Sequence, residues 1–253
     1  MKDLEEKVVV LTGATGGVGA ATAKLYAKYG ARLVLADLNI DTLRTLKAEL
    51  PLSGQQVTIV ETDISDEKAV ENLVNKTLDA FGRIDVWVNN AGFAGSKKCL
   101  IEDYDLDMAR KVFDINALGT FMCMQKVLPV MRAQESGVIV NVASVCADRA
   151  TPYQSIYAAS KAAVVAMTKS AAWEYGQYGI RAIAVGPSAI DTPMIDAFAN
   201  GDPEAVKKMR AASNPLGRIA EPLEIANLIA FLSSDMASFM TGSNILIDGG
   251  NRK

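Results

Sequence analysis

The feature that most constrains the fold is a regular alternation of short apolar runs with longer helical segments. Runs such as RLVLAD (32–37) and IRAIAVGP (180–187) are apolar almost throughout, rather than at every second position. Strands of that kind are buried on both faces, which is typical of parallel sheets covered by helices. The segments between the runs can provide this cover, so the sequence predicts an α/β chain with a doubly wound parallel sheet.

About seven strands are predicted, and most are followed by a helix. They are expected at 7–12, 32–37, 57–63, 84–92, 137–144, 180–187 and 244–250. Apolar residues at helical spacing predict helices at about 16–30, 41–50 and 69–81 and a longer one at about 108–132. No linker rich in Pro, Gly or Ser interrupts the series, so we expect residues 1–253 to form one domain.

The composition is that of a soluble globular protein and argues against several partners. Half of the 253 residues are apolar and 22% are charged. The net charge of −3 provides no basic surface for nucleic acid. No apolar run is long enough to cross a bilayer, and the charged start MKDLEEK is unlike a signal peptide. We therefore expect a cytoplasmic protein with neither a nucleic-acid nor a membrane partner.

The chain contains no histidine, which narrows the chemistry available to it. Catalytic arrangements of the Ser-His-Asp or Cys-His type are excluded, and so are metal sites with histidine ligands. The cysteines at 99, 123 and 146 are too few and too scattered for a disulfide framework or a zinc ribbon. The acidic run 103–107 resembles the start of an EF-hand loop but lacks its glycine. No metal site is expected, and another side chain must move any proton.

The segment TGATGGVGA follows the first predicted strand and opens the first helix. Gly13, Gly17 and Gly19 allow a tight turn and a close backbone approach, and the free N–H groups at a helix start can bind a diphosphate. The spacing G-x-x-x-G-x-G differs from the common G-x-G-x-x-G fingerprint, and the Gly-Lys pair of a P-loop is absent. Alone, the turn is compatible with dinucleotide binding or with an ordinary strand-to-helix connection.

Asp37 favours dinucleotide binding and also favours one cofactor. It ends the second predicted strand, 18 residues after Gly19. A carboxylate at that place can accept hydrogen bonds from both hydroxyls of a ribose and would repel a 2′-phosphate. Leu38 and Asn39 follow it, and no basic residue lies within the glycine turn. The sequence therefore predicts a Rossmann fold that binds NAD rather than NADP.

YAASK, residues 157–161, places a phenol and an amine one helical turn apart on the same face of a helix. The small residues between them would let a ligand approach. A tyrosine has a pKa of about 10 and is a poor base near neutrality. Because a neighbouring ammonium favours the phenolate, we expect Lys161 to lower the pKa of Tyr157. Taken alone, the pair is also compatible with an ordinary helix surface.

Together these motifs resemble the short-chain dehydrogenase/reductase family in its short, single-domain form. TGATGGVG (12–19) is similar to its cofactor turn, TDI (62–64) to its adenine-contacting stretch, and NNAG (89–92) to the motif that steadies its central sheet. Ser144 precedes Tyr157 by 13 positions, as the family pattern requires, and TGSNILIDGG (241–250) also matches. The resemblance extends from Thr12 to Gly250 and implies a Rossmann fold.

The resemblance implies an oxidoreductase that transfers a hydride between NAD(H) and a secondary alcohol or ketone. Tyr157 would exchange a proton with the substrate oxygen, which Ser144 would hydrogen-bond. Lys161 would support the phenolate and bind the nicotinamide ribose, and Asn116 would kink its helix and hold a water connected to the lysine. The residues implied at the cofactor are Thr12, Gly13, Gly17, Val18, Gly19, Asp37, Asp63, Ile64, Asn90, Ala91, Gly92, Tyr157, Lys161, Pro187, Ile190 and Thr192.

The chain departs from the family pattern after the sixth strand. The family commonly has Pro-Gly there, whereas this chain has Pro187 and Ser188, which affects the expected loop geometry. From about Asp191 to Pro215 we expect a mobile helical lid over a moderately apolar substrate. The candidate substrate contacts are Ser144, Cys146, Tyr153, Met194 and Phe198. All of them except Ser144 are equally compatible with plain packing.

Two other functions are compatible with parts of the pattern. A dinucleotide-sensing regulator would keep the fold without catalysis, but such a protein is expected to lose Tyr157 or Lys161, and both are present. A sugar-nucleotide epimerase shares Y-x-x-x-K but needs a longer C-terminal region and another glycine spacing. The resemblance further implies a homotetramer or homodimer, formed through the helix that carries YAASK. The identity of the substrate and the direction of the reaction stay open.

Overall fold

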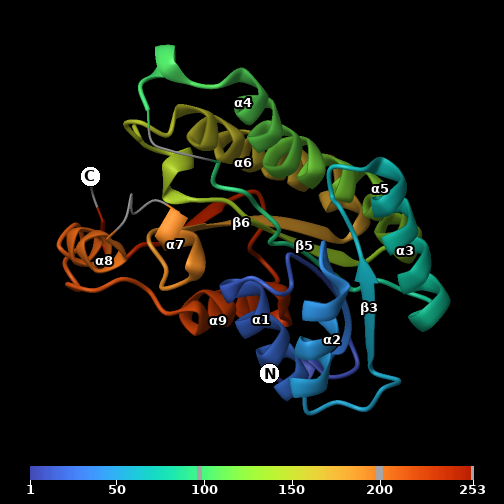
Figure 1. Ribbon diagram of the computed structural model, residues 1–253. Helices are drawn as coiled ribbons and strands as arrows, with labels where there is room; N and C mark the ends of the chain where they lie inside the picture. The colour runs from blue at the N-terminus through green and yellow to red at the C-terminus, as the bar shows by residue number, and fades with distance from the viewer. Residues whose placement is uncertain (96–98, 198–201, 252–253) are drawn as a thin grey trace.

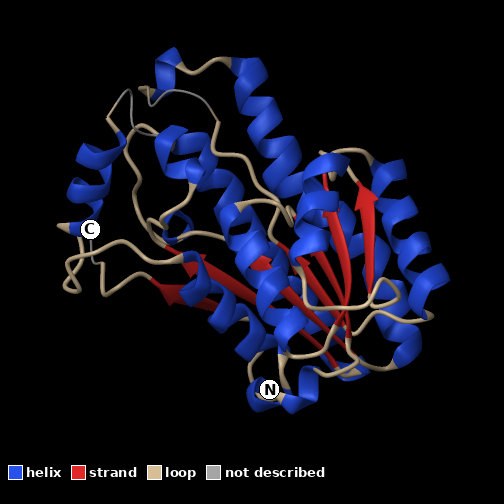
Figure 2. Ribbon diagram, turned by 60° about the horizontal axis from the view of Figure 1, so that its bottom comes forward, coloured by secondary structure: helices blue, strands red, loops and turns tan. Residues whose placement is uncertain are grey.

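The computed structural model describes residues 1–95, 99–197 and 202–251. The strands in these ranges are β1 Val8–Thr12, β2 Arg32–Asp37, β3 Val57–Glu61, β4 Val86–Asn89, β5 Gly137–Val142, β6 Ile180–Pro187 and β7 Asn244–Ile247. They form one seven-stranded sheet in the order β3-β2-β1-β4-β5-β6-β7 (Figure 1). All neighbouring strands are parallel, and Figure 2 shows the sheet between its helices. The predicted doubly wound α/β fold is confirmed.

The helices are α1 Gly17–Lys28, α2 Ile40–Glu49, α3 Glu67–Phe81, α4 Leu106–Phe113, α5 Thr120–Gln134, α6 Ser155–Tyr175, α7 Pro193–Ala197, α8 Pro203–Ala211 and α9 Pro222–Ser233. One face of the sheet is covered by α1, α2 and α9, and the other by α3, α5 and α6 (Figure 1). α4 packs against α6. α7 and α8 follow β6 and lie beyond its carboxyl end (Figure 1).

The apolar strands are explained by this double cover. β1 and β4 are buried at every position, and both lie inside the sheet with helices on each side. The covering helices are apolar on one face only. In α3, for example, Val70, Leu73 and Val74 are buried, whereas most of the remaining positions are charged or polar.

The strand order reverses between β1 and β4, which are neighbours although β2 and β3 lie between them in the chain. In the register of the sheet, Leu11 of β1 pairs with Leu35 of β2 on one side and with Val88 of β4 on the other. The connections that leave β1 and β4 therefore diverge to opposite faces and open a crevice at the carboxyl ends of these strands. This edge is where a doubly wound sheet binds its ligand.

The helix predicted at about 108–132 contains a π-helical turn. α4 ends at Phe113, residues Asp114–Gly119 form a π-helical turn, and α5 begins at Thr120. Because a π turn keeps the chain helical while it takes in an extra residue, the apolar spacing looked continuous. The predicted long helix is present from Leu106 to Gln134, and only the π turn within it was not predicted. Asn116, which the resemblance implies to kink this helix, lies within the π turn.

Candidate active site

The glycine turn between β1 and α1 has no room for side chains. Gly13 has a φ of +62°, and a Cβ there would lie 2.6 Å from the Cα of Ala91. A Cβ on Gly19 would lie 2.1 Å from the carbonyl oxygen of Gly13, and one on Gly17 would lie 2.4 Å from Cγ2 of Thr192. No described side chain caps α1, so its first N–H groups are available to a ligand. The turn is a cradle for an anionic group.

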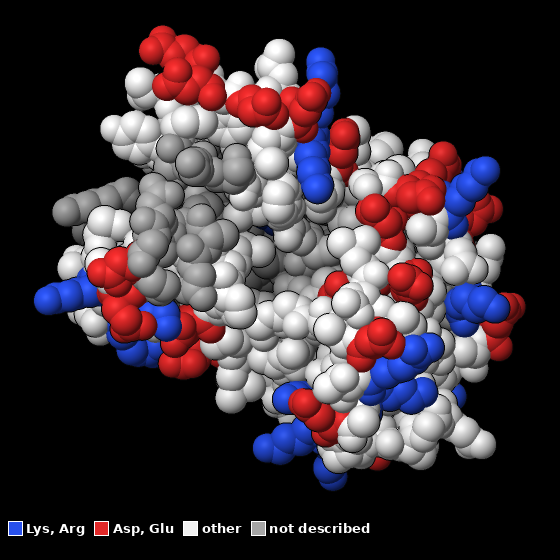
Figure 3. Space-filling model, viewed as in Figure 1, with Lys and Arg blue, Asp and Glu red and all other residues white. Residues whose placement is uncertain are grey.

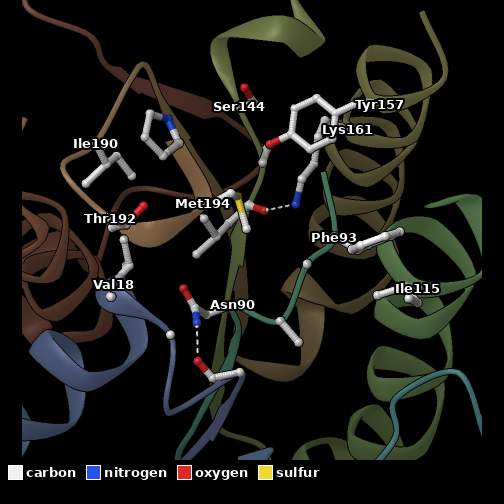
Figure 4. A pocket seen from close by; sticks show the side chains of 18 of the residues that line it. Val18, Asn90, Phe93, Ile115, Ser144, Tyr157, Lys161, Ile190, Thr192 and Met194 are labelled. Atoms are coloured by element: carbon white, nitrogen blue, oxygen red, sulfur yellow. Dashed lines mark hydrogen bonds between the residues drawn. The ribbon is translucent and has the colours of Figure 1, made fainter. Parts of the chain in front are cut away.

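The loop after β4 holds this turn in place. The Nδ2 group of Asn90 donates to the carbonyl oxygens of Thr12 at 3.1 Å and of Gly13 at 2.8 Å. Figure 4 draws one of these bonds. In return, Oγ1 of Thr12 accepts from the backbone N–H groups of Asn90 and Ala91 at 3.1 and 3.2 Å. These bonds join the two strands on either side of the crevice. The structure thus brings the TG and NNAG motifs together.

Asp37 lies at the end of β2 and lines the same crevice. Its Oδ2 accepts from the backbone N–H of Thr15 at 2.9 Å and from the Thr15 hydroxyl at 2.7 Å, and its Oδ1 accepts from the N–H of Leu38. Oδ2 thus accepts two hydrogen bonds, whereas Oδ1 accepts one and can still accept from a ligand hydroxyl. Thr15, which the sequence argument missed, fixes the orientation of this carboxylate. Asp63 and Ile64, which follow β3, also line the crevice.

The π-helical turn places Asn116 in the interior, where its side chain is fully buried. Oδ1 accepts from the N–H of Phe93 at 2.7 Å, and Nδ2 donates to the Phe93 carbonyl at 2.8 Å and to Oγ of Ser160 at 3.1 Å. A Cβ on Gly92 would lie 3.4 Å from Oδ1 of Asn116 and 3.3 Å from Nζ of Lys161. Asn116 of the π turn and Lys161 of α6 are therefore neighbours around Gly92.

A chain of buried amides positions α6. Nε1 of Trp87 donates to Oδ1 of Asn89, and Nδ2 of Asn89 donates to Oδ1 of Asn141, both at 2.8 Å. Nδ2 of Asn141 then donates at 2.8 Å to Oγ1 of Thr168, which lies on α6. Satisfied buried networks of this kind specify one arrangement of the elements that they join. This series of hydrogen bonds fixes α6, the helix that carries Tyr157, relative to β4 and β5.

Tyr157 and Lys161 extend from α6 into the cavity, and Tyr157 faces Ser144 at the end of β5 (Figure 4). A side-chain hydrogen bond joins Tyr157 to Ser144. Oγ of Ser144 accepts from the N–H of Cys146 at 3.1 Å, and Nζ of Lys161 donates to the carbonyl of Val142 at 2.9 Å. The hydroxyls of Tyr157 and Ser144 thus meet at one point of the cavity wall.

Burial governs the charges of this pair. It raises the pKa of Tyr157 above its usual value; the Cys146 thiol adds to the rise and the hydrogen bond with Ser144 opposes it. Burial also lowers the pKa of Lys161 to about 8. The expectation that Lys161 lowers the pKa of Tyr157 is wrong for the protein alone. The ammonium lies over the ring, 5.9 Å from its centre, and the pKa of Tyr157 is raised by burial although this charge is near.

One cavity of about 1280 Å³ is lined by the glycine turn, Asp37, the loop after β4, Ser144, Tyr157 and Lys161. The molecular surface is hollowed near the centre of the face shown in Figure 3, and most charged side chains on that face lie toward its periphery. We call the part lined by Gly13, Gly17, Asp37 and Asp63 the turn end. We call the part lined by Cys146, Gln154, Met194, Ile195, Arg210, Ser213 and Asn251 the α8 end.

Most of the predicted residues line the cavity, but Thr12, Gly19 and Asn116 are not among the residues that line it. Pro187, Ile190 and Thr192 line the cavity as the loop after β6 crosses it, so Ser188 does not prevent the expected course of the loop. Tyr153 is 55% exposed and is not part of the cavity lining. Its neighbour Gln154, which the sequence argument missed, lines the cavity instead. Phe198 lies outside the described residues.

An ion-paired arginine that no motif indicated holds Asn251 at the α8 end. Nη2 of Arg149 pairs with Oδ2 of Asp248 at 2.9 Å, and its Nη1 donates to the carbonyl of Asn251 at 2.6 Å. Nδ2 of Asn251 donates to Oγ of Ser213 at 3.1 Å. Arg149 thereby connects the loop after β5 with the segments that follow β7 and α8.

Within the described residues, no group of three or more His, Cys, Asp or Glu side chains is arranged to hold a metal ion. No helix in the same ranges is long and apolar enough to span a membrane.

Comparison with known proteins gives the same picture over the whole chain. Residues 13–252 match the family model described as enoyl-(acyl carrier protein) reductase. Levodione reductase from Leifsonia aquatica is 42% identical over 97% of this chain and 94% of that protein. Cis-4-hydroxycyclohexanecarboxylate dehydrogenase from Sinomonas cyclohexanicum is 41% identical over 97% of this chain and 96% of that protein.

Solved structures agree. The crystal structure of levodione reductase superposes with a TM-score of 0.93 at 40% identity and covers 97% of both chains. That of NAD⁺-bound xylitol dehydrogenase superposes with a TM-score of 0.90 at 32% identity, over 98% of this chain and 99% of the other. With the glycine turn, the NNAG loop and the Ser-Tyr-Lys constellation brought to one cavity, the chain belongs to the short-chain dehydrogenase/reductase family.

Proposed function

We propose that the protein is an NAD-dependent oxidoreductase that interconverts a secondary alcohol and a ketone. The observation that carries the proposal is the meeting of the Tyr157 and Ser144 hydroxyls on the wall of a cavity whose other end is an anion cradle. A site with both features can hold a dinucleotide and a small substrate side by side. The relatives are named as reductases and dehydrogenases, which supports the same class of reaction.

The turn end fits a nicotinamide dinucleotide. The first N–H groups of α1 would bind its diphosphate, and Asp37 would accept hydrogen bonds from the adenosine ribose. Because the fixed Asp37 carboxylate would repel a 2′-phosphate, we propose NAD rather than NADP. The NAD⁺ complex of the related xylitol dehydrogenase supports this choice. The other proposed contacts are Thr12, Val18, Asp63, Ile64, Asn90, Ala91, Gly92, Pro187, Ile190 and Thr192, of which all but Thr12 line the cavity.

When bound, NAD supplies a carbon that accepts or releases a hydride. The protein supplies the proton and the charge balance. In the direction of ketone reduction, the Tyr157 O–H donates its proton to the substrate oxygen as negative charge develops there, and the Ser144 hydroxyl hydrogen-bonds the same oxygen. The raised pKa of Tyr157 keeps this proton in place in the protein alone.

Alcohol oxidation needs the opposite proton movement, from the substrate hydroxyl to Tyr157. Positive charge must then offset the burial that disfavours the phenolate. Lys161, with a pKa of about 8, carries most of its ammonium charge at neutral pH and is held against the Val142 carbonyl for this purpose. Asn116 maintains the Gly92 loop beside it through its bonds to Phe93.

We place the substrate at the α8 end. The lid over it would be the segment 191–215, which contains α7 and α8. Met194, on α7, projects into the middle of the cavity in Figure 4, and Cys146 lines the wall near Tyr157. Both present apolar surface, so a ring or short chain of carbon atoms suits this space. One relative is named for a substrate with a hydroxylated cyclohexane ring, which supports a cyclic alcohol.

We also propose a cytoplasmic homotetramer or homodimer. The described cysteines are all free, which suits a reducing compartment. The exposed apolar side chains of Leu106 on α4 and Phe121 on α5 favour self-association on that side of the molecule. Light scattering on the purified protein measures the subunit number directly.

The proposed reaction is tested by following the absorbance of NADH and NADPH with a panel of cyclic and open-chain secondary alcohols. The Tyr157→Phe variant keeps the ring and removes the proton, so we expect kcat to fall by at least about 100-fold. NADH affinity, measured by fluorescence, should stay close to that of the parent protein. Undiminished turnover in the variant would refute the mechanism, and equal rates with NADPH would refute the role of Asp37.

A further inference from the structure

The cationic side chains on the cavity wall differ in what they bind. The described residues of this kind are Arg110, Lys111, Lys161 and Arg210. The first three have partners within the protein, which are the Asp107 carboxylate, the Phe93 ring and the Val142 carbonyl. The guanidinium of Arg210 has no hydrogen bond or ion pair with any residue that the structure describes; only its backbone carbonyl is bonded.

Carboxylates close to the α8 end in the fold are already paired with other cations. Oδ1 of Asp191 lies 2.8 Å from Nζ of Lys207, which precedes Arg210 by one turn of α8. Asp248 pairs with Arg149 at 2.9 Å. The acidic residues that line the cavity lie at the turn end or on the side of α4, and no described residue of the α8 end is acidic. Arg210 therefore faces this end of the cavity without a counterion from the described chain.

The backbone of Arg210 is fixed in the cavity wall. It lies in the last turn of α8, and its carbonyl accepts from Oγ of Ser213 at 2.6 Å. The same Oγ accepts from Asn251, which Arg149 holds in turn. A guanidinium on a fixed backbone is partly prepared for binding, because less conformational freedom is lost when a ligand arrives.

We propose that Arg210 binds a carboxylate of the substrate, so that the protein acts on hydroxy acids and keto acids whose acid group is remote from the reacting carbon. The inference rests on the proposed function, because it takes the α8 end as the place of the substrate. A guanidinium matches a carboxylate with two parallel N–H donors. The acid group would lie at Arg210 while the hydroxyl or carbonyl of the same molecule reaches Tyr157 and Ser144.

The diphosphate of the dinucleotide is a second anion to consider as a partner of Arg210. The turn end already offers that group the N–H donors at the start of α1, whereas Arg210 belongs to the wall built by α8 and the segment after β7. In Figure 1, α8 lies at the outer edge of the molecule, away from α1. A measurement of dinucleotide affinity separates the two partners.

The test uses ligands that cannot react, so that it does not depend on turnover. Cyclohexanecarboxylate and cyclohexanecarboxamide are titrated by calorimetry into the protein saturated with NADH. The variants are Arg210→Gln, which removes the charge, and Arg210→Lys, which keeps it without the fork. Lys208→Gln is the matched control, because Lys208 is an exposed cation on α8 that does not line this cavity.

In the parent protein we expect the carboxylate to bind more tightly than the amide, and the difference to shrink as salt is added. Arg210→Gln should weaken carboxylate binding by about 10- to 100-fold, the size of a charge-assisted hydrogen bond, and leave amide binding within about twofold. Arg210→Lys should recover part of the loss, and Lys208→Gln should change neither ligand.

Three results would overturn the proposal: equal binding of the two ligands to the parent protein, equal weakening of both by Arg210→Gln, or a loss of NADH affinity in that variant with no change for the carboxylate. The last would assign Arg210 to the dinucleotide. Failure of the proposed reaction is recognised separately, since a protein that oxidises no alcohol can still show the Arg210-dependent difference in binding.

Discussion

At the turn end of the cavity the shape is set by the backbone, whereas at the α8 end it is set by side chains. The glycines at 13, 17 and 19 and the Asn90 amide fix the turn end through contacts that involve main-chain atoms. At the α8 end, the Arg149–Asp248 pair and the bond from Asn251 to Ser213 join segments that are far apart in the chain. The backbone-built turn end suits a cofactor that is the same in every reaction. The shape of the α8 end can be altered by single substitutions, which suits a site for different substrates.

The largest effect is expected from a side chain placed in the backbone-built end. A Cβ in Gly19→Ala would lie 2.1 Å from the Gly13 carbonyl, so the turn must shift. We expect the free energy of unfolding to fall by about 1–3 kcal/mol. NADH binding should weaken by about 10- to 100-fold, because the shifted turn must be restored on binding. Denaturant unfolding and NADH fluorescence measure the two effects.

Gly176→Ala is the matched control for that substitution, because nothing lies within 4 Å of a Cβ there and its φ of −56° suits alanine. It should change neither quantity appreciably. If Gly19→Ala behaved like Gly176→Ala, the turn would not be a backbone-built cradle, and the contrast between the two ends would be lost.

A smaller and different effect is expected at the α8 end from Arg149→Gln. The variant loses the ion pair with Asp248 and loosens Asn251, so we expect about 1–2 kcal/mol less stability, as for a partly buried charged hydrogen bond. The KM for the substrate should rise about tenfold while the Kd for NADH stays within about twofold. This separation of KM from Kd is the sign that the two ends are built independently.

Arg44→Gln provides the comparison for the lost charge. Arg44 pairs with Asp41 at 2.6 Å on α2, and both side chains are well exposed. Its loss should cost less than about 1 kcal/mol and alter neither constant. A parallel rise of KM and Kd in Arg149→Gln would instead mean that the α8 end and the turn end move together.

The difference between the two ends also explains which parts of the fold and of the site could be predicted from the sequence. Strands β2 and β6 have the predicted bounds, because a strand buried on both faces is apolar throughout and cannot be mistaken for a one-sided element. The residues of the turn end could also be predicted from the sequence, since a close backbone approach requires glycine at particular positions. A carboxylate at the end of β2 is likewise typical of a ribose-binding site. Thr15 was missed there because a threonine in a turn carries no such requirement.

The α8 end and the interior could not be predicted in this way. Arg149 and Asp248 are separated by 99 positions, and no local pattern connects them. The amide chain through Asn141 is hidden in an apolar strand, where an asparagine gives no sign of its partner on α6. The same holds for pKa values: spacing placed Lys161 beside Tyr157, but only the packed structure shows that burial outweighs the charge between them.

The smallest effect on stability is expected from Lys161, which lies where the two ends meet. Its pKa of about 8 in the folded protein is below the value of about 10.4 in an unfolded chain. Below pH 8 both states carry the proton, and the burial of the charge costs about 3 kcal/mol. Lys161→Met removes this cost but leaves the Val142 carbonyl without its donor, a loss of about 1–3 kcal/mol. At pH 7 the variant should therefore be inactive yet more stable by about 0–2 kcal/mol.

The pH dependence distinguishes this explanation from simple packing. Between pH 8 and about 10.4 the unfolded parent binds more protons than the folded parent, so its stability rises with pH, and the variant lacks this rise. The advantage of Lys161→Met should thus fall by about 2 kcal/mol between pH 7 and 9.5, as measured by urea unfolding. Lys169→Met, at an exposed position of the same helix, should show no such change. A stability difference for Lys161→Met that is independent of pH would mean that the ammonium is well solvated, and that the substrate side of α6 is more open than the contacts of Lys161 indicate.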